Sequence, residues 1–381
     1  MKQLQNIAVI DIGKTNAKVV LVDLKELFEI DYFSTPNIIL NDEPFPHYDI
    51  KALWSFIRST LSVMQTRYGV DAISVTTHGA GVILLDSFGQ PILPILDYEY
   101  GGPDSLTEKY NQLRPDFSLS GTPRSPLSVI LGAQIYWLLF TKPEISQRLN
   151  CLVTYPQYWV GLFTGNWCTE VSYLGCHTDL WLPWEKKFSG LVKRLGLTNK
   201  IAPIRKASDL IGPVLPSVSR EIGLPKMTPV YCGIHDSNAS LYRHLLAQSK
   251  PFSLLSTGTW VIIMAIGGKE KILDQRRDLL VNVNALGDPV PSARFMGGRE
   301  FEILTKDISV TPTEHEISTV LDKLIMLSPS IIPQFGPFQN RNAKWSVPEV
   351  QLSQGERTVV ASLYLAMMAT TCLNIIGAEG P

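Results

Sequence analysis

Charge and cysteine are both scarce in this sequence, and each shortage excludes a class of protein. Charged residues make up 18% of the 381 positions and the formal net charge is −1, so the basic face that binds nucleic acid is not expected. The five cysteines are odd in number and show no CxxC spacing. This pattern argues against a disulfide scaffold or a zinc site and favours a reducing, cytoplasmic compartment.

Long apolar runs and an amino-terminal leader are also lacking. No stretch reaches the roughly 20 apolar residues that a membrane helix needs. Residues 1–5 lead directly into a strand-like segment, which leaves no room for a signal peptide. We therefore expect no membrane contact. The length exceeds that of one ordinary core, so two domains are predicted, residues 1–245 and 246–381.

Two segments combine an apolar run with a tight glycine turn. The first is Asp11-Ile12-Gly13-Lys14-Thr15-Asn16, and the second is Ser256-Thr257-Gly258-Thr259-Trp260. Each predicts a strand–turn–strand hairpin whose backbone N–H groups and hydroxyls point at one spot, which suits a polyanion. The alternative at each position is a plain β-turn. A Walker P-loop is excluded at the first segment, because Ala8 stands where that motif needs glycine.

A carboxylate lies between these two segments in the chain. Asp236 follows the apolar run Val230–Cys232 and precedes a predicted helix. Two interpretations are open: a general base that accepts a proton from a reacting hydroxyl, or the N-cap of the helix. Two phosphate-binding turns with one carboxylate between them favour phosphoryl transfer from a nucleotide.

The remaining pattern predicts a mixed α/β fold. Residues 50–67 carry apolar side chains at helical spacing, and residues 72–75 and 82–85 have the composition of strands. Further helices are expected at residues 127–140, 154–163, 186–195 and 357–376.

Six motifs in chain order resemble one known family, the FGGY carbohydrate kinases of the actin/hexokinase/Hsp70 superfamily. Their wording is most similar to the branch of rhamnulose and fuculose kinases. The motifs are Asp11–Asn16, Thr77–Pro91, Tyr158–Gly165, Ile211–Val214, Gly233–Ser240 and Ser256–Trp260. The resemblance implies two ribonuclease-H-like (actin-like ATPase) domains around a central cleft. Family members run longer, so the second domain is expected to be incomplete and truncated on its adenosine-binding side.

The resemblance also implies a role for individual residues. Asp236 would be the catalytic base of a sugar kinase, and Asp11 would hold Mg²⁺ through water, with a turn-capping role as its alternative. The sugar would meet His78, Gly79, Asp97, Tyr98 and His235, although a structural role is the alternative for either histidine. The phosphates of ATP would be bound by Gly13, Lys14, Thr15, Asn16, Thr257, Gly258 and Thr259.

The expected partners are therefore a small sugar, ketose or deoxyketose, and ATP with Mg²⁺; a homodimer is compatible with the sequence. Two rival functions stay open. One is an ATPase like actin or Hsp70 that has no sugar substrate. The other is a catalytically impaired sugar-binding relative.

Overall fold

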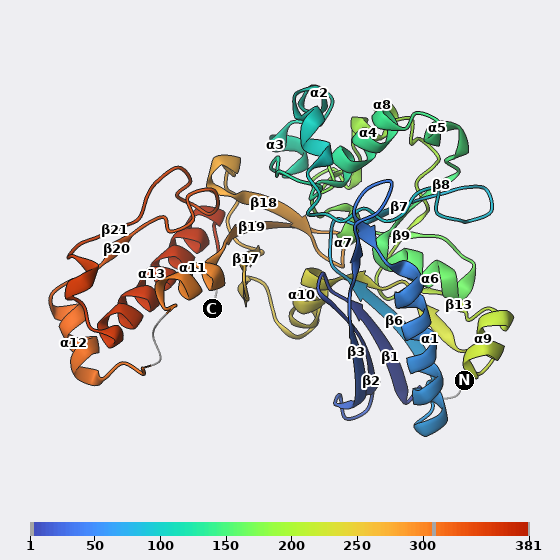
Figure 1. The fold of residues 1–381 in the computed structure, drawn as a ribbon, viewed down its shortest axis with the longest axis horizontal. Helices are drawn as coiled ribbons and strands as arrows, with labels where there is room; N and C mark the ends of the chain where they lie inside the picture. The colour runs from blue at the N-terminus through green and yellow to red at the C-terminus, as the bar shows by residue number, and fades with distance from the viewer. Residues whose placement is uncertain (1–3, 307–309, 380–381) are drawn as a thin grey trace. The chain divides into compact units, whose positions relative to one another are not determined.

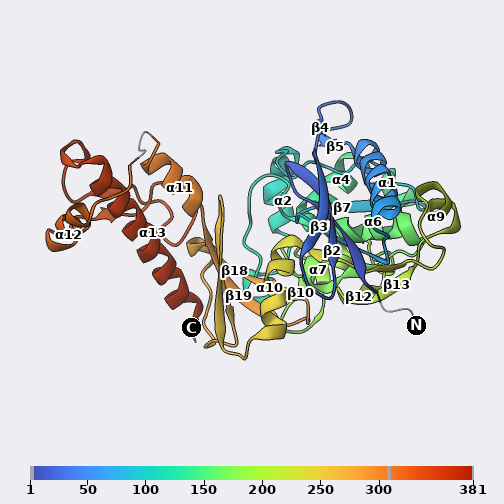
Figure 2. The same cartoon turned by 90° about the horizontal axis from the view of Figure 1, so that it is seen from below.

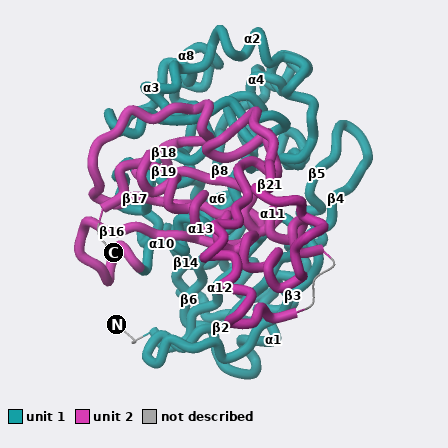
Figure 3. Tube along the Cα trace, turned by 90° about the vertical axis from the view of Figure 1, so that its left-hand side faces the viewer, with its two compact units in different colours: residues 1–243, 283–289 teal, residues 244–282, 290–381 magenta. Residues whose placement is uncertain are grey.

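The computed structural model describes residues 4–306 and 310–379, which divide into two compact units (Figures 1 and 3). Unit 1 comprises residues 1–243 and 283–289, and unit 2 comprises residues 244–282 and 290–381. Each unit has its own sheet and its own apolar core, and each is described by itself below.

The main sheet of unit 1 is built around β1 (Asn6–Ile12). Alternate residues of this strand, among them Ala8, Ile10 and Ile12, are fully buried, as the period of a strand requires. On one side β1 pairs antiparallel with β2 (Asn16–Asp23), which pairs antiparallel with β3 (Glu29–Pro36). On its other side β1 pairs parallel with β6 (Ala72–Thr77). The sheet is completed by β13 (Leu210–Pro213), β14 (Pro229–Tyr231) and β15 (Ile234–His235).

Two helices pack side by side on this sheet. The first, α1 (Ile50–Arg67), is capped by Asp49, whose side chain accepts a 2.9 Å hydrogen bond from Ala52 N–H. The second, α6 (Tyr155–Thr164), ends at Gly165 in the left-handed conformation. The two helices lie side by side (Figure 2). Trp54 of α1 contacts Phe163 of α6 with ring centroids 4.8 Å apart. The helices predicted at residues 50–67 and 154–163 are thus confirmed.

The helix predicted over residues 186–195 is wrong in its first half. Lys186 adopts a left-handed backbone with φ 50°, and a short strand follows at Lys187–Phe188. The helix α8 begins only at Gly190, where the Ser189 side chain caps it by accepting from Leu191 N–H.

Unit 1 also contains β4 (Ile39–Leu40), β5 (His47–Tyr48), β7 (Val82–Leu85), η1 (Gly102–Leu106), α2 (Thr107–Asn111), α3 (Phe117–Ser120), α4 (Leu131–Thr141), α5 (Ile145–Arg148), β8 (Cys151–Thr154), β9 (Thr169–Glu170), α7 (Val171–Leu174), β10 (Trp181–Leu182), β11 (Lys187–Phe188), α8 (Gly190–Arg194), β12 (Ile204–Arg205) and α9 (Pro216–Ile222).

Unit 2 holds a four-stranded sheet in the order β16-β17-β19-β18. Its first two strands, β16 (Phe252–Thr257) and β17 (Val261–Ile266), form the second predicted hairpin, which is confirmed. Helices pack against one another beside this sheet, α13 against α11 and α12. The remaining bounds are α10 (Asp236–Ala247), which runs from unit 1 into unit 2, and η2 (Gln275–Arg277), β18 (Leu279–Val283), β19 (Pro289–Phe295), α11 (Gly297–Leu304), α12 (Glu314–Asp322), β20 (Leu327–Ser328), β21 (Lys344–Trp345), η3 (Glu349–Gln351) and α13 (Gln354–Ile376).

The helix α13 departs from one expectation drawn from the sequence. With 23 residues it is long and apolar enough to cross a membrane by length and composition alone. However, Tyr364, Met368, Cys372 and Ile376 on one of its faces are buried in the apolar core of unit 2. A core helix passes the same criterion, so we describe α13 as a core element of that unit.

Candidate active site

Three predicted site segments converge at one edge of the unit 1 sheet. In the β1–β6 pairing Ile12 lies opposite Thr77, and in the β15–β6 pairing His235 lies opposite the same Thr77. Because these strands are parallel, their carboxyl ends meet at one edge. The residues that follow Ile12, Thr77 and His235 are the Gly13 turn, His78 and Asp236, so the main sheet brings these three together.

Asp236 is the first residue of α10, and its carboxylate is 42% exposed. Its Oδ1 accepts a 2.5 Å hydrogen bond from Ser237 N–H and lies 3.4 Å from Nε2 of His235. An N-cap side chain instead accepts from the second or third residue of its helix. The contacts of Asp236 therefore differ from those of a helix cap.

Asp11 lies within the electrostatic reach of Asp236. Burial raises the pKa of the Asp11 carboxyl, the negative charge of Asp236 raises it further, and Lys18 opposes both effects. A carboxylate whose ionised form is disfavoured by burial and by a neighbouring negative charge is stabilised by a cation in its neighbourhood. Among the residues that the structure describes, no group of three or more histidines, cysteines or acids could hold a metal ion.

His78 is buried and electrically neutral. Burial lowers its pKa to about 4, against a smaller opposing effect of its hydrogen bond to Gly79. Its Nδ1 lies 2.6 Å from the carbonyl oxygen of Gly79, so Nδ1 carries the proton and Nε2 has a lone pair. That buried Nε2 has no hydrogen-bond partner within residues 4–306 and 310–379. It is therefore an acceptor that a bound ligand could satisfy.

His235 is also buried, and burial lowers its pKa while Asp236 opposes the change. Gly79 gives the ring its space: a Cβ at position 79 would lie 2.7 Å from Nε2 of His235. The ring stands edge-on to Tyr173 with centroids 5.6 Å apart. The glycine predicted to contact the sugar thus also has a packing role behind the candidate base.

Lys14 lies beside two acidic side chains of the predicted sugar segment. Its ammonium forms an ion pair with Asp97 and lies 3.4 Å from a carboxylate oxygen of Glu99. It also lies 4.9 Å from the ring centroid of Tyr98. The assignment of Lys14 to a phosphate stays a prediction, and the contacts described here are those of the sugar segment.

Three tyrosines of this neighbourhood were not predicted from the sequence. Tyr48 and Tyr155 each lie with their ring centroids 5.1 Å from that of His78. The Tyr173 hydroxyl accepts from Gly81 N–H at 2.8 Å and donates to the carbonyl oxygen of His78 at 3.1 Å. No local motif marks these residues, because they come from β5, α6 and α7.

The remaining predicted phosphate contacts lie in two turns, one in each unit. In unit 1, Gly13 N–H donates to Asn16 O at 2.9 Å, and Thr15 and Asn16 are exposed in the same turn. In unit 2, Thr257 ends β16 and Gly258 N–H donates to Trp260 O at 3.0 Å. The amino end of α11 lies against this second turn, where Arg299 N–H approaches the carbonyl oxygen of Thr259 at 3.4 Å.

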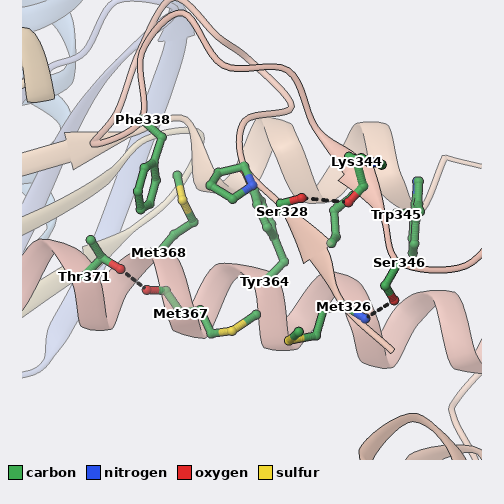
Figure 4. A pocket seen from close by; sticks show the side chains of 12 residues that line it. Met326, Ser328, Phe338, Lys344, Trp345, Ser346, Tyr364, Met367, Met368 and Thr371 are labelled. Carbon is green, nitrogen blue, oxygen red and sulfur yellow. Dashed lines mark hydrogen bonds between the residues drawn. The ribbon is translucent and has the colours of Figure 1, made fainter. Parts of the chain in front are cut away.

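Unit 2 also contains a cavity of about 510 Å³ above α13 (Figure 4). Its lining is mainly apolar and includes Phe338, Trp345, Tyr364, Met367 and Met368. None of the residues predicted from the sequence to bind sugar or phosphate lines it.

Comparison with known proteins assigns both parts of the chain to one protein family. Residues 6–242 match the N-terminal domain of the FGGY family of carbohydrate kinases, and residues 249–381 match the FGGY carbohydrate kinase C-terminal domain. Among curated proteins, L-fuculokinase of Salmonella typhi is 23% identical over 272 residues, which cover 69% of this chain and 57% of that protein. The match thus spans little more than half the length of this relative.

Solved structures extend the likeness over nearly the whole chain. A carbohydrate kinase from Novosphingobium aromaticivorans is 36% identical with a TM-score of 0.90, over 98% of this chain and 83% of that one. A xylulose kinase from Lactobacillus acidophilus has a TM-score of 0.79 at 14% identity, over 99% and 80% of the two chains. The prediction of an α/β, two-domain fold of the actin-like ATPase type is confirmed.

Proposed function

The chain belongs to the FGGY family of carbohydrate kinases, and on that premise we propose that it transfers the γ-phosphoryl group of ATP to a sugar hydroxyl. A deoxyketose such as fuculose or rhamnulose is the substrate we favour, in line with the relative named L-fuculokinase. The observation that carries the proposal is the meeting of Asp236, His78 and the Gly13 turn at one sheet edge.

Asp236 is the general base of this proposal. A sugar hydroxyl is a poor nucleophile until a nearby group accepts its proton, which is worth about 10²–10⁴-fold in rate. As the proton passes to Asp236, the hydroxyl oxygen bonds to the γ-phosphorus and the bond from that phosphorus to the ADP oxygen breaks. His235 lies 3.4 Å from Oδ1 and limits the positions that the carboxylate can take.

Each glycine turn, taken by itself, is proposed as a phosphate-binding element. The proposed donors are the hydroxyls of Thr15, Thr257 and Thr259 and the side-chain amide of Asn16, because the N–H groups of Gly13 and Gly258 already donate within their own turns. The neighbouring carboxylates of Asp11 and Asp236 fit a Mg²⁺ ion held by few protein ligands, phosphate and water. Mg²⁺ would neutralise charge that develops on the phosphates.

The test is Asp236→Asn, which keeps the size of the side chain and removes its basicity. We expect sugar-dependent ADP release to fall by about 10²-fold or more, while calorimetric binding of the sugar persists. Asp322→Asn, at an exposed position of α12, is the matched control and should retain the parent rate.

Parent-like turnover in Asp236→Asn would refute the assigned base. ATP hydrolysis by the parent that no sugar stimulates would favour an ATPase without a sugar substrate. Sugar binding without ATP binding would instead identify a catalytically impaired relative.

A further inference from the structure

The ion pair between Lys14 and Asp97 is held in a largely enclosed, aromatic setting. The two side chains are only 18% and 10% exposed. The ammonium of Lys14 lies 5.4 Å from the ring centroid of Tyr48 and 4.9 Å from that of Tyr98. A cation placed between tyrosine faces, beside a carboxylate, is held in one position rather than left to sample solvent.

Asp97 is fixed as firmly as the lysine. Its N–H donates to the carbonyl oxygen of Pro46 at 2.9 Å, and its Oδ1 accepts from Glu99 N–H at 3.2 Å and from the Tyr48 hydroxyl at 3.4 Å. The same Oδ1 accepts from Lys14. The positive charge of Lys14 is therefore already matched, and its neighbour Glu99 adds a further negative charge.

An acceptor without a partner among the described residues and a further negative charge lie near this pair. His78 presents a buried acceptor at Nε2 without a partner in the described chain, and its ring adjoins that of Tyr98 at 5.3 Å. Asp236 acts electrostatically on both His78 and Tyr98. Hydroxyl groups of a ligand can donate to such acceptors, whereas the carboxylate of a sugar acid offers no donor and would meet like charge.

We propose that the Lys14–Asp97 ion pair is a specificity element that admits uncharged polyhydroxy substrates and rejects sugar acids. The inference rests on the proposed function, because it concerns the sugar site of the same kinase. Asp97 matches the ammonium, so that no cation is available for an anionic substrate. Lys14 in turn holds Asp97 where a substrate hydroxyl can donate to it. Lys14 is thus a positioning residue that acts through Asp97.

The test compares the binding of a neutral and an acidic probe, L-fuculose and D-gluconate, by calorimetry without ATP. The parent should bind L-fuculose and show at least about tenfold weaker binding of D-gluconate, which is a difference of about 1.4 kcal/mol. Asp97→Asn keeps the shape but removes the carboxylate charge. It should shift the preference towards D-gluconate by at least about tenfold, because the ammonium is then available to the acid.

Two variants at position 14 separate positioning from other roles. Lys14→Met should raise KM for L-fuculose at least about tenfold with a smaller change in kcat, and it should gain no affinity for D-gluconate. Lys14→Arg, which keeps the charge, should recover most of the loss. Thermal unfolding of each variant identifies any protein that has failed to fold, and Lys14→Arg keeps the test decisive if Lys14→Met is unstable.

Several outcomes would overturn the inference. Equal binding of both probes by the parent, or an unchanged preference in Asp97→Asn, would exclude charge selection by the pair. A rise in KM for ATP rather than for L-fuculose in Lys14→Met would assign Lys14 to a phosphate. L-fuculose binding with the expected preference but without phosphorylation would refute the proposed function and leave the inference intact. If neither probe binds, the inference fails, whereas the proposed kinase function is decided by its own test, sugar-dependent ADP release.

Discussion

Replacing Gly79 by alanine tests whether the packing behind Asp236 matters for catalysis. The backbone of Gly79 does not have a positive φ, so alanine adds no strain of its own there. Its Cβ would lie 2.7 Å from Nε2 and 3.2 Å from Cδ2 of His235. Ordinary contact begins at 3.4 Å, so the imidazole must retreat by about 0.7 Å.

This displacement of the His235 ring should lower both the stability of the protein and its kcat. His235 is only 5% exposed, and forcing extra volume into such a site typically costs about 1–3 kcal/mol of stability. The ring also lies 3.4 Å from Oδ1 of Asp236. A 1 Å displacement of catalytic groups can cost on the order of 10²-fold in rate, so we expect kcat to fall by about ten- to a hundredfold.

The assay is sugar-dependent ADP release, measured together with thermal unfolding. Gly190→Ala is the matched control, because the nearest atom to its Cβ is the terminal Nη1 of the flexible Arg194 side chain. A double-mutant cycle locates the cause: in a His235→Ala background the added methyl group should have almost no further effect. Parent-like kcat in Gly79→Ala, or an undiminished effect in the His235→Ala background, would refute the reasoning.

Two further predictions concern pH and metal. Burial raises the pKa of Glu170 to about 7 from a usual 4.5, so the folded state holds the proton more tightly. Stability should therefore fall as pH rises from about 5 to 7, by about 2 kcal/mol. Thermal unfolding of the parent and of Glu170→Gln at both pH values checks this, and parallel profiles would contradict it. Asp11→Asn should raise the Mg²⁺ concentration for half-maximal activity several-fold without lowering the melting temperature, because burial and Asp236 both disfavour the ionised Asp11 carboxyl. An unchanged Mg²⁺ titration would count against the proposed role.

The elements that could be predicted from the sequence are those whose signals are local. The helix at residues 50–67 has its apolar spacing and its cap at Asp49 within a few residues of each other. Both glycine hairpins likewise combine an apolar run with their turn. The helix predicted over residues 186–195 was wrong because other local signals oppose the apolar pattern there. A left-handed residue at Lys186 and a cap at Ser189 interrupt the apolar pattern that suggested one continuous helix.

The residues of the candidate site could be grouped from the sequence only through the family resemblance. The pairing that places Asp236, His78 and the Gly13 turn at one edge joins strands far apart in the chain, and it appears only in the structure. The tyrosines at positions 48, 155 and 173 could not be predicted from the sequence, because their contacts depend on how β5, α6 and α7 pack.

Lys14 shows why the type of a residue does not determine its partner. A lysine in a glycine turn is typical of a phosphate contact, yet the carboxylate that it meets belongs to Asp97, 83 positions further along the chain. A sequence motif limits the chemistry of a side chain to a cation, and the fold then decides which anion it binds. If the ammonium is matched by Asp97, the charge that the motif provides is used to orient a sugar contact. The phosphate contact proposed for the Gly13 turn must then rest on another donor of that turn, such as the Thr15 hydroxyl.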